Sequence, residues 1–204
     1  MERKEEKLPM EPELIRRGKV VLAGHLAIKK IVGWERALDT QYAHKIANEV
    51  LRDLGASAVQ LRIVRLNVRK GGRKALLIGK RTPMDNTSMK YFKLHDPVAG
   101  GKMNEGLKDE IRRQHESRFD LPEIDWAASL LTEAGIVDKD ICAPNFIVTP
   151  EGEVVFHEIL SDHGSGGHIN TKVSLKGFSN ETANKIRNLF NEYRKKKLEW
   201  GFRR

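Results

Sequence analysis

The sequence predicts an α+β protein in which a small antiparallel sheet carrying one helix precedes a mainly helical half with a β-hairpin. Three observations lead to this prediction. Short apolar runs separated by glycines fill much of residues 18–79, a long helical pattern interrupts them at 33–54, and two more helical patterns precede a hairpin at 146–159. We therefore expect a charged arm at residues 1–12, a first lobe at 13–81 and a reduced second lobe at 82–204.

The composition favours partners that carry negative charge. The chain has 204 residues and a net charge of +9, which suits nucleic acid, nucleotide phosphates or an acidic membrane surface. It contains no apolar run of about 18 residues that could span a membrane. Its start, Met1–Lys7, lacks the apolar stretch of a secretory signal, and its single cysteine, Cys142, fits a reducing cytoplasm. The basic residues gather in two clusters: Arg62, Arg65, Arg69, Lys70, Arg73 and Lys74, and then Arg194–Lys197 with Arg203 and Arg204.

The first lobe should contain four strands and one helix. Lys19–Gly24 and His25–Val32 read as paired strands, and Gly33–Leu54 as a helix with apolar residues every four positions, which ends at a left-handed Gly55. In the third strand, 58–68, the apolar alternation changes phase and predicts a bulge near Val64. A glycine turn then leads into an apolar strand at Lys74–Gly79.

The second lobe should be mainly helical. Thr82–Met103 is polar and rich in proline and glycine, which predicts a long loop. We then expect, in order, a charged helix at Asn104–Phe119, a helix from Pro122 to Gly135, a short strand at Lys172–Phe178 and a helix from Ser179 to Leu198.

The segment Asp138–Glu158 carries the candidate chemistry. A polar loop with Asp140 and Asn145 leads into a strand at Phe146–Thr149, a turn at Pro150–Gly152 and a strand at Val154–Ile159 that includes Glu158. A tight hairpin fixes the distance between its ends, so these three side chains should lie near one another. Their oxygen atoms are the ligands that Mg²⁺ prefers.

This segment resembles the catalytic loop and metal-binding hairpin of protein-kinase-like phosphotransferases. The resemblance implies that Asp140 is the catalytic residue and that Asn145 and Glu158 bind the metal. Three departures are present: Asp138-Lys139 replaces His-Arg, Glu158 replaces the family's aspartate, and Ile159-Leu160 replaces Phe-Gly. The triplet Asp162-His163-Gly164 looks like the missing motif four residues late, which leaves open whether Asp162 is the metal ligand instead.

The same resemblance extends to the first lobe. Leu26–Lys29 resembles the kinase strand whose lysine binds the nucleotide phosphates, and Lys29 fits the register better than Lys30. The resemblance implies that Glu49 pairs with Lys29, and that Lys80 lies in the connection between the lobes where adenine binds. A glycine-rich phosphate loop is missing, because only Gly18 and Gly24 are available. ATP and Mg²⁺ are the implied cofactors.

Four functions follow from these patterns. The first is a kinase-like enzyme that moves the γ-phosphate of ATP to a hydroxyl acceptor, and the second is a nucleotide-binding pseudokinase. The third is a basic nucleic-acid-binding protein without catalysis. The fourth is metal-dependent hydrolysis by a cluster of His157, His163 and His168, whose spacing fits no helical zinc motif. Only about 45 residues follow Glu158, so a compact enzyme acting on a small molecule, or a reduced lobe that needs a partner, is favoured over a protein kinase.

Overall fold

The computed structural model describes residues 15–17, 20–23, 26–31, 33–68, 72–94, 100–118, 121–137, 145–160 and 167–201. Its largest sheet has five antiparallel strands in the order β1-β2-β3-β6-β5. The strands are β1 (Ile15–Arg17), β2 (Val20–Ala23), β3 (Leu26–Ile31), β5 (Leu61–Val68) and β6 (Gly72–Lys80). The predicted pairing of β2 with β3 is confirmed, and so is the predicted hairpin of β5 and β6.

Helix α1 (Trp34–Val50) follows β3 and packs on one face of this sheet. Its Ala37 is buried against Ala75 and Leu77 of β6, and the ring nitrogen of its first residue, Trp34, donates to the carbonyl of Lys74 at 2.5 Å. A short 3-10 turn at Arg52–Leu54 ends at Gly55, whose φ of 66° confirms the predicted left-handed cap.

The predicted bulge near Val64 is wrong. The β5–β6 register is one-to-one from Leu61 opposite Gly79 to Val68 opposite Gly72. Leu61 and Ile63 pack toward α1, but the next residue on that face, Arg65, lies at the start of the helix, 5.2 Å above the ring of Trp34. The apolar alternation therefore stops where the helix no longer covers the sheet, rather than changing phase.

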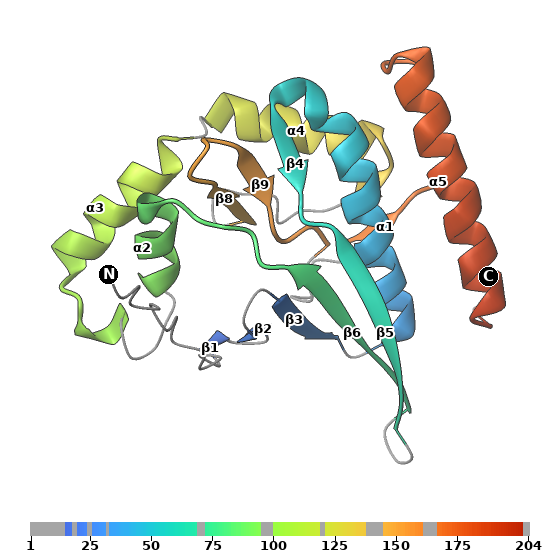
Figure 1. Cartoon of the computed structure of the whole chain (residues 1–204). Helices are drawn as coiled ribbons and strands as arrows, with labels where there is room; N and C mark the ends of the chain where they lie inside the picture. Colours follow the sequence, from blue (N-terminus) through green and yellow to red (C-terminus); the bar gives the residue numbers. More distant parts are fainter. Residues whose placement is uncertain are drawn as a thin grey trace, which may run out of the picture.

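A second sheet joins the two halves of the chain (Figure 1). Strand β4 (Ala56–Ala58) runs parallel to β9 (Val154–Phe156), and β8 (Phe146–Val148) pairs antiparallel with β9. The predicted β8–β9 hairpin is thus confirmed, but its second strand ends at Phe156 instead of the predicted Ile159, so Glu158 lies just beyond the strand. The parallel pairing with β4 has no counterpart among the sequence predictions.

The second half is mainly helical, as predicted. Its elements are α2 (Asn86–Leu94), a 3-10 turn at Gly100–Lys102, α3 (Glu105–Glu116), α4 (Leu121–Glu133), β7 (Ile136–Val137), β10 (His168–Ile169) and α5 (Asn180–Glu199). Strand β7 pairs antiparallel with β10. Asn104 and Ser179 cap α3 and α5, and each side chain accepts a hydrogen bond from a backbone N–H three residues later.

Two predictions for this half are wrong. The expected loop at Thr82–Met103 contains α2, because Asp85 caps a helix there: its Oδ1 accepts from the N–H of Ser88 at 2.8 Å. The expected strand at Lys172–Phe178 is a series of turns, in which the N–H of Phe178 donates to the carbonyl of Leu175.

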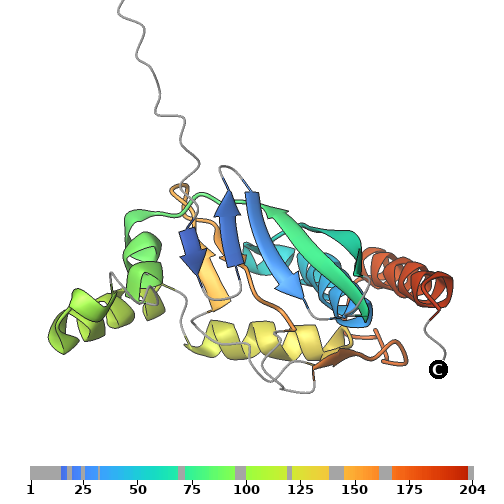
Figure 2. The same cartoon turned by 90° about the horizontal axis from the view of Figure 1, so that it is seen from below.

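The main hydrophobic core draws residues from both sides of the expected boundary after residue 81. Leu38 and Ile46 of α1 pack in one cluster with Leu131 of α4, Phe156 of β9 and Ile186 of α5. Helix α5 lies along α1 at one end of the molecule, and α2 and α3 lie at the other end (Figures 1 and 2). Helix α1 thus belongs to both halves, and the division into two lobes stays a prediction. No helix in the described ranges is long and apolar enough to cross a membrane.

Candidate functional site

Two predicted site residues, Asn145 and Glu158, flank the open end of the β8–β9 hairpin. At its closed end, the N–H of Gly152 donates to the carbonyl of Thr149 at 3.0 Å, and Gly152 has a φ of 89°. At its open end, the N–H of His157 donates to the carbonyl of Asn145 at 2.9 Å. Asn145 is buried and Glu158, the residue after His157, is half-buried. The last hydrogen bond of the hairpin therefore fixes the backbone of Asn145 beside the residue that precedes Glu158.

Both edges of this hairpin are held by other elements. On the β8 edge, the N–H of Asp85 donates to the carbonyl of Val148, and the N–H of Val148 donates to Ser88 Oγ, both at 2.9 Å. His115 of α3 stacks on Phe146 and bonds its carbonyl through Nε2 at 3.2 Å. Strand β4 pairs with the β9 edge. The open end is therefore presented by a rigid support, which a site for positioned chemistry needs.

Helix α1 holds the chain that follows Glu158 through polar side chains at every fourth position. We call Arg36, Thr40, His44 and Asn48 the polar stripe. Arg36 donates to the carbonyl of Gly167. Thr40 Oγ1 lies 2.9 Å from the carbonyl of Arg36 in the same helix and 3.4 Å from the carbonyl of Leu160. His44 bonds both Val59 and Ile159, and Asn48 bonds both backbone groups of Ala58. Each of the four side chains contacts a backbone group outside the helix, and Thr40 and Asn48 also bond carbonyls within it. The stripe thus ties β4, its connection to β5, and the segment after β9 to one helix face.

Two members of the stripe, His44 and Thr40, contact the two residues that follow Glu158. The N–H of Ile159 donates to His44 Nε2 at 3.3 Å, while His44 Nδ1 lies 2.9 Å from the carbonyl of Val59. This pair of partners requires a neutral ring with its proton on Nδ1. Thr40 Oγ1 lies 3.4 Å from the carbonyl of Leu160, which is buried and has a φ of 58°. Such a backbone conformation is uncommon for a branched apolar residue and persists only where its surroundings enforce it.

The apolar periodicity that predicts the helix at 33–54 does not predict the polar stripe. The signal was present in the sequence: four polar residues recur at the same spacing of four that marks one helix face. A buried polar face on a helix requires hydrogen-bonding partners, so it predicts contact with irregular backbone rather than with another apolar surface.

The structure places the backbone of Lys29, but its side chain lies outside the described residues. Lys29 is opposite Leu77 of β6, and Lys30 is opposite Leu76. The side chain of Leu77 is buried toward α1, so position 29 belongs to the face of the sheet that α1 covers. Lys80 is the last residue of β6 and is exposed. Asp140, Asp162 and His163 fall outside the described residues, and their roles stay predictions.

Glu49 contacts two basic side chains other than Lys29. Its Oε2 lies 3.5 Å from Arg52 Nη2 and 3.6 Å from Lys185 Nζ, so it faces α5. The pairing of Glu49 with Lys29 remains a prediction, because the side chain of Lys29 is not described.

A more deeply buried acid on α1 is Asp39. Tyr193 of α5 donates its hydroxyl to Asp39 Oδ1 at 2.6 Å. Burial raises the pKa of Asp39, and the hydrogen bond from Tyr193 and the charge of Lys197 oppose this shift. Burial and the nearby Asp39 carboxylate also raise the pKa of Tyr193. This pair fastens α5 to α1 and lies among packed side chains, which suits a structural role.

The donor types at the hairpin end fit Mg²⁺. Asn145 offers an amide oxygen and Glu158 a carboxylate, both hard ligands. Within the described ranges, no group of three His, Cys, Asp or Glu side chains is arranged to hold a metal. Of the histidine cluster considered above, His157 packs edge-on to Phe92 at 4.9 Å and His168 is exposed in β10.

No protein-family model matches the sequence, and no curated protein matches it significantly. Among solved structures, the chain is similar to a medium-resolution structure of the bifunctional kinase-methyltransferase WbdD, with 13% identity and a TM-score of 0.32. It is similar also to a co-crystal structure of WbdD with a kinase inhibitor, with 13% identity and a TM-score of 0.35. The matches cover 85% and 86% of this chain but only 34% and 43% of the others, so the chain spans less than half the length of these proteins.

Proposed function

We propose that the protein is a compact phosphotransferase that moves the γ-phosphate of ATP to a hydroxyl acceptor with the help of Mg²⁺. The observation that carries this proposal is the hydrogen bond that closes the β8–β9 ladder between His157 and Asn145. It holds Asn145 beside the strand that leads to Glu158, and the loop containing Asp140 enters the hairpin at this same end.

Each side chain has a defined task in this reaction. Asn145 and Glu158 would hold Mg²⁺, which would neutralise charge on the nucleotide phosphates. Asp140 accepts the proton of the acceptor hydroxyl. The hydroxyl oxygen then forms a bond to the γ-phosphorus, the bond from that phosphorus to the β–γ bridging oxygen breaks, and ADP leaves. Catalysis comes from positioning and charge compensation, which is why a rigid hairpin end supports the proposal.

The five-stranded sheet supports the nucleotide part of the proposal. Position 29 lies on the sheet face that α1 covers, so Lys29 is the lysine proposed to bind the phosphates. Glu49 is proposed to brace Lys29, an arrangement that would replace its contacts with Arg52 and Lys185. Lys80, exposed at the end of β6, is proposed to lie beside the bound nucleotide.

The decisive experiment measures ATP turnover with a panel of small hydroxyl compounds, with and without Mg²⁺. Asp140→Asn should abolish transfer but keep the rise in melting temperature that bound nucleotide causes. Glu158→Gln should increase the Mg²⁺ concentration needed for half-maximal turnover about tenfold, because a charged ligand is lost. Glu151→Gln, in the exposed turn of the same hairpin, is the matched control and should change neither. Full turnover by Asp140→Asn would remove this residue from the mechanism.

A pseudokinase gives a different result in the same assay. Glutamate at the metal position and the missing glycine-rich loop both favour nucleotide binding without transfer. ATP would then raise the melting temperature of the unaltered protein, yet no ADP would form with any acceptor.

One contact favours a separate function, binding of nucleic acid through a basic surface. Arg65 of β5 lies 5.2 Å from the ring of Trp200, the residue after α5. Arg65 of the first basic cluster therefore lies beside the end of α5, three residues after Lys197 of the second cluster. This function predicts an affinity for RNA or DNA duplexes that falls steeply with salt and falls again in Arg65→Gln. Tight binding that is insensitive to salt would contradict it.

A further inference from the structure

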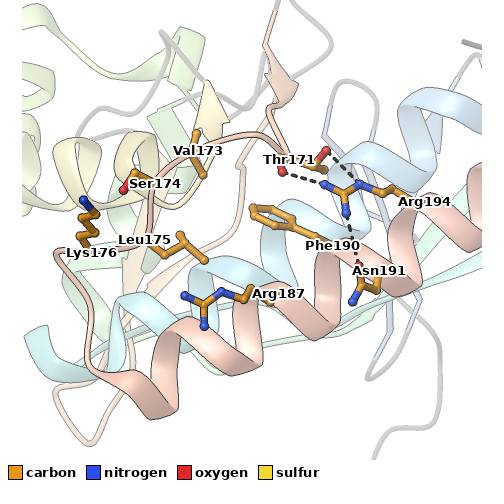
Figure 3. Close-up of a pocket in the computed structure, with 9 residues that line it drawn as sticks. All are labelled: Thr171, Val173, Ser174, Leu175, Lys176, Arg187, Phe190, Asn191 and Arg194. Atoms are coloured by element: carbon orange, nitrogen blue, oxygen red, sulfur yellow. Dashed lines mark hydrogen bonds between the residues drawn. The ribbon is translucent and has the colours of Figure 1, made fainter.

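A pocket of about 460 Å³ lies between α5 and the chain that follows β10 (Figure 3). Small-molecule sites in proteins commonly have about 300 to 1,000 Å³. The lining residues come from these two segments: Thr171, Val173, Ser174, Leu175 and Lys176 from one, and Arg187, Phe190, Asn191 and Arg194 from the other.

The wall opposite α5 is fixed at several points. Arg194 donates from Nη2 to the carbonyl of Thr171 at 2.8 Å and from Nε to Thr171 Oγ1 at 3.2 Å. The N–H of Asn170 donates to the carbonyl of Gly135 at 2.7 Å, which holds the start of the wall against the end of α4. The N–H of Phe178 donates to the carbonyl of Leu175 and closes a turn at its far end. A ligand therefore meets a preformed pocket and orders little chain on binding, which lowers the cost of association.

The lining combines positive charge with an apolar floor. Three of the nine residues are cationic, Lys176, Arg187 and Arg194, and none is acidic. Phe190 and Leu175 are buried and, with the half-buried Val173, form the apolar part of the lining. The bonds of Arg194 to Thr171 and Asn191 use three of the five guanidinium N–H groups, so the guanidinium group is held in one orientation. Arg187 is exposed on α5, and its guanidinium bonds only Asn184 of the same helix among the contacts described.

This chemistry suits a phosphate ester. A guanidinium presents paired donors that match two phosphate oxygens, and a phosphate monoester carries about two negative charges near neutral pH. The floor of Phe190 and Leu175 accommodates an organic group attached to the phosphate. A polyanion without an apolar part would leave this floor unused.

The pocket is separate from the proposed phosphotransfer site. In the antiparallel β7–β10 pair, Val137 is opposite His168 and Ile136 is opposite Ile169. The chain therefore leaves this pair after Val137 at one end and after Ile169, where the pocket wall begins, at the other end. The pocket lining includes neither Asn145 nor Glu158 of the hairpin end.

We propose that this pocket binds a small molecule that carries a phosphate ester, independently of ATP and Mg²⁺. Arg187 and Lys176 contact the phosphate, Arg194 supplies charge and fixes the wall, and Phe190 supports the organic group. A site of this kind lets a second small molecule influence the protein, whichever reaction the hairpin end supports.

The test is calorimetric titration of the full chain with phenyl phosphate in the absence of ATP and Mg²⁺. Phenyl phosphate should bind with a stoichiometry of one and more tightly than inorganic phosphate, because its ring reaches the apolar floor. Arg187→Gln should weaken binding about tenfold, the typical effect of losing one charged hydrogen-bonding group. Lys195→Gln removes the same charge from an exposed position of α5 outside the pocket and should weaken binding less than about twofold.

Three outcomes would overturn the proposal. They are the absence of saturable binding at millimolar phenyl phosphate, an equal loss in both variants, and displacement of phenyl phosphate by a short RNA at lower concentration. The last outcome would assign the pocket to the phosphates of a nucleic acid. Both variants change exposed side chains, so unaltered melting temperatures will establish that their folds are intact. Because nucleotide is absent from this titration, its result does not depend on whether the protein transfers phosphate.

Discussion

The backbone N–H of Ile159 donates a hydrogen bond to Nε2 of His44, with 3.3 Å between the two nitrogens. This bond joins the middle of α1 to the residue directly after Glu158. His44 is almost fully buried and its other ring nitrogen bonds Val59, so both partners lose their contact if the ring is removed. The orientation of the hairpin end thus depends on a helix from the other half of the chain.

We predict that His44→Ala destabilises the protein by about 2–4 kcal/mol, because it leaves a cavity and two buried backbone groups without their partner. The comparison is Lys45→Ala, the neighbouring residue, which is partly exposed and contacts Glu192 and the face of Tyr42. Urea unfolding of both variants measures the difference. Equal unfolding midpoints would mean that the His44 contacts contribute nothing to the fold.

The register of β3 separates two neighbouring lysines. Lys29→Ala should lower ATP turnover at least tenfold, because position 29 is on the sheet face toward α1, where the proposed nucleotide phosphates bind. Lys30→Ala, on the opposite face of the same strand, should change turnover less than about twofold. The rate at saturating and at low ATP distinguishes lost binding from lost catalysis. A larger effect at Lys30 would reverse the assignment, and no effect at either would remove β3 from the site.

The elements that the sequence predicts correctly are determined by residues that are close to one another in the chain. The β8–β9 hairpin is encoded by Gly152 and its apolar flanks, and α5 by its Ser179 cap, so short patterns suffice for both. The pairing of β4 with β9 joins residues about a hundred positions apart and leaves no local signal. The sequence does not predict α2, because its cap, Asp85, lies in a stretch whose prolines and glycines predict a loop.

In the candidate site, too, features set by residues close together in the sequence could be predicted, and contacts between distant residues could not. The sequence could predict that Asn145 and Glu158 flank the same end of one hairpin, because a tight turn connects its two strands. Their roles as metal ligands stay predictions. The support from His44 could not, because its partner Ile159 lies 115 residues away and offers only a backbone N–H, which every residue except proline has. The bulge predicted at Val64 is wrong because the apolar alternation ends where α1 no longer covers the sheet. That point, marked by the contact of Arg65 with Trp34, depends on tertiary packing and cannot be recognised in the local sequence.

The raised pKa of Asp39 predicts a specific pH dependence of stability. Burial is its main cause, and the ordinary value is 3.8. Between 3.8 and the higher pKa of the folded state, the folded protein holds more protons than the unfolded chain, so stability decreases as pH rises through this interval. Asp39→Asn removes the titrating group and keeps an oxygen that accepts from Tyr193. The stability of this variant relative to the unaltered protein should therefore increase from pH 3 upward and level off above the raised pKa.

Urea unfolding at a series of pH values measures this curve. Asp53→Asn removes one negative charge from an exposed position and controls for net charge. A relative stability of Asp39→Asn that does not change with pH would show that Asp39 titrates normally. Tyr193→Phe provides a second check: without the hydroxyl that stabilises the carboxylate, the decrease in stability should extend to higher pH.

Two glycines with similar φ angles should differ greatly in their tolerance of alanine. Gly152 has a φ of 89° and a Cβ there would meet no atom within 4 Å, so Gly152→Ala should cost only the backbone strain of about 1–2 kcal/mol. Gly135 has a φ of 85°, but its Cβ would lie 2.3 Å from the carbonyl oxygen of Asn170 and 3.1 Å from Phe190. Gly135→Ala should therefore destabilise by about 4 kcal/mol or more, because backbone must move.

The same substitution tests the wall of the phosphate-ester pocket. The atoms that clash with a Cβ at position 135 belong to Asn170, Val173 and Phe190, and the last two line the pocket. Gly135→Ala should thus weaken phenyl phosphate binding in the fraction that remains folded, while Gly152→Ala should leave binding unchanged. Equal unfolding midpoints for the two variants would mean that residues 170–173 shift easily away from Gly135. The pocket would then not be preformed, and phosphate-ester binding would have to include the cost of ordering that segment.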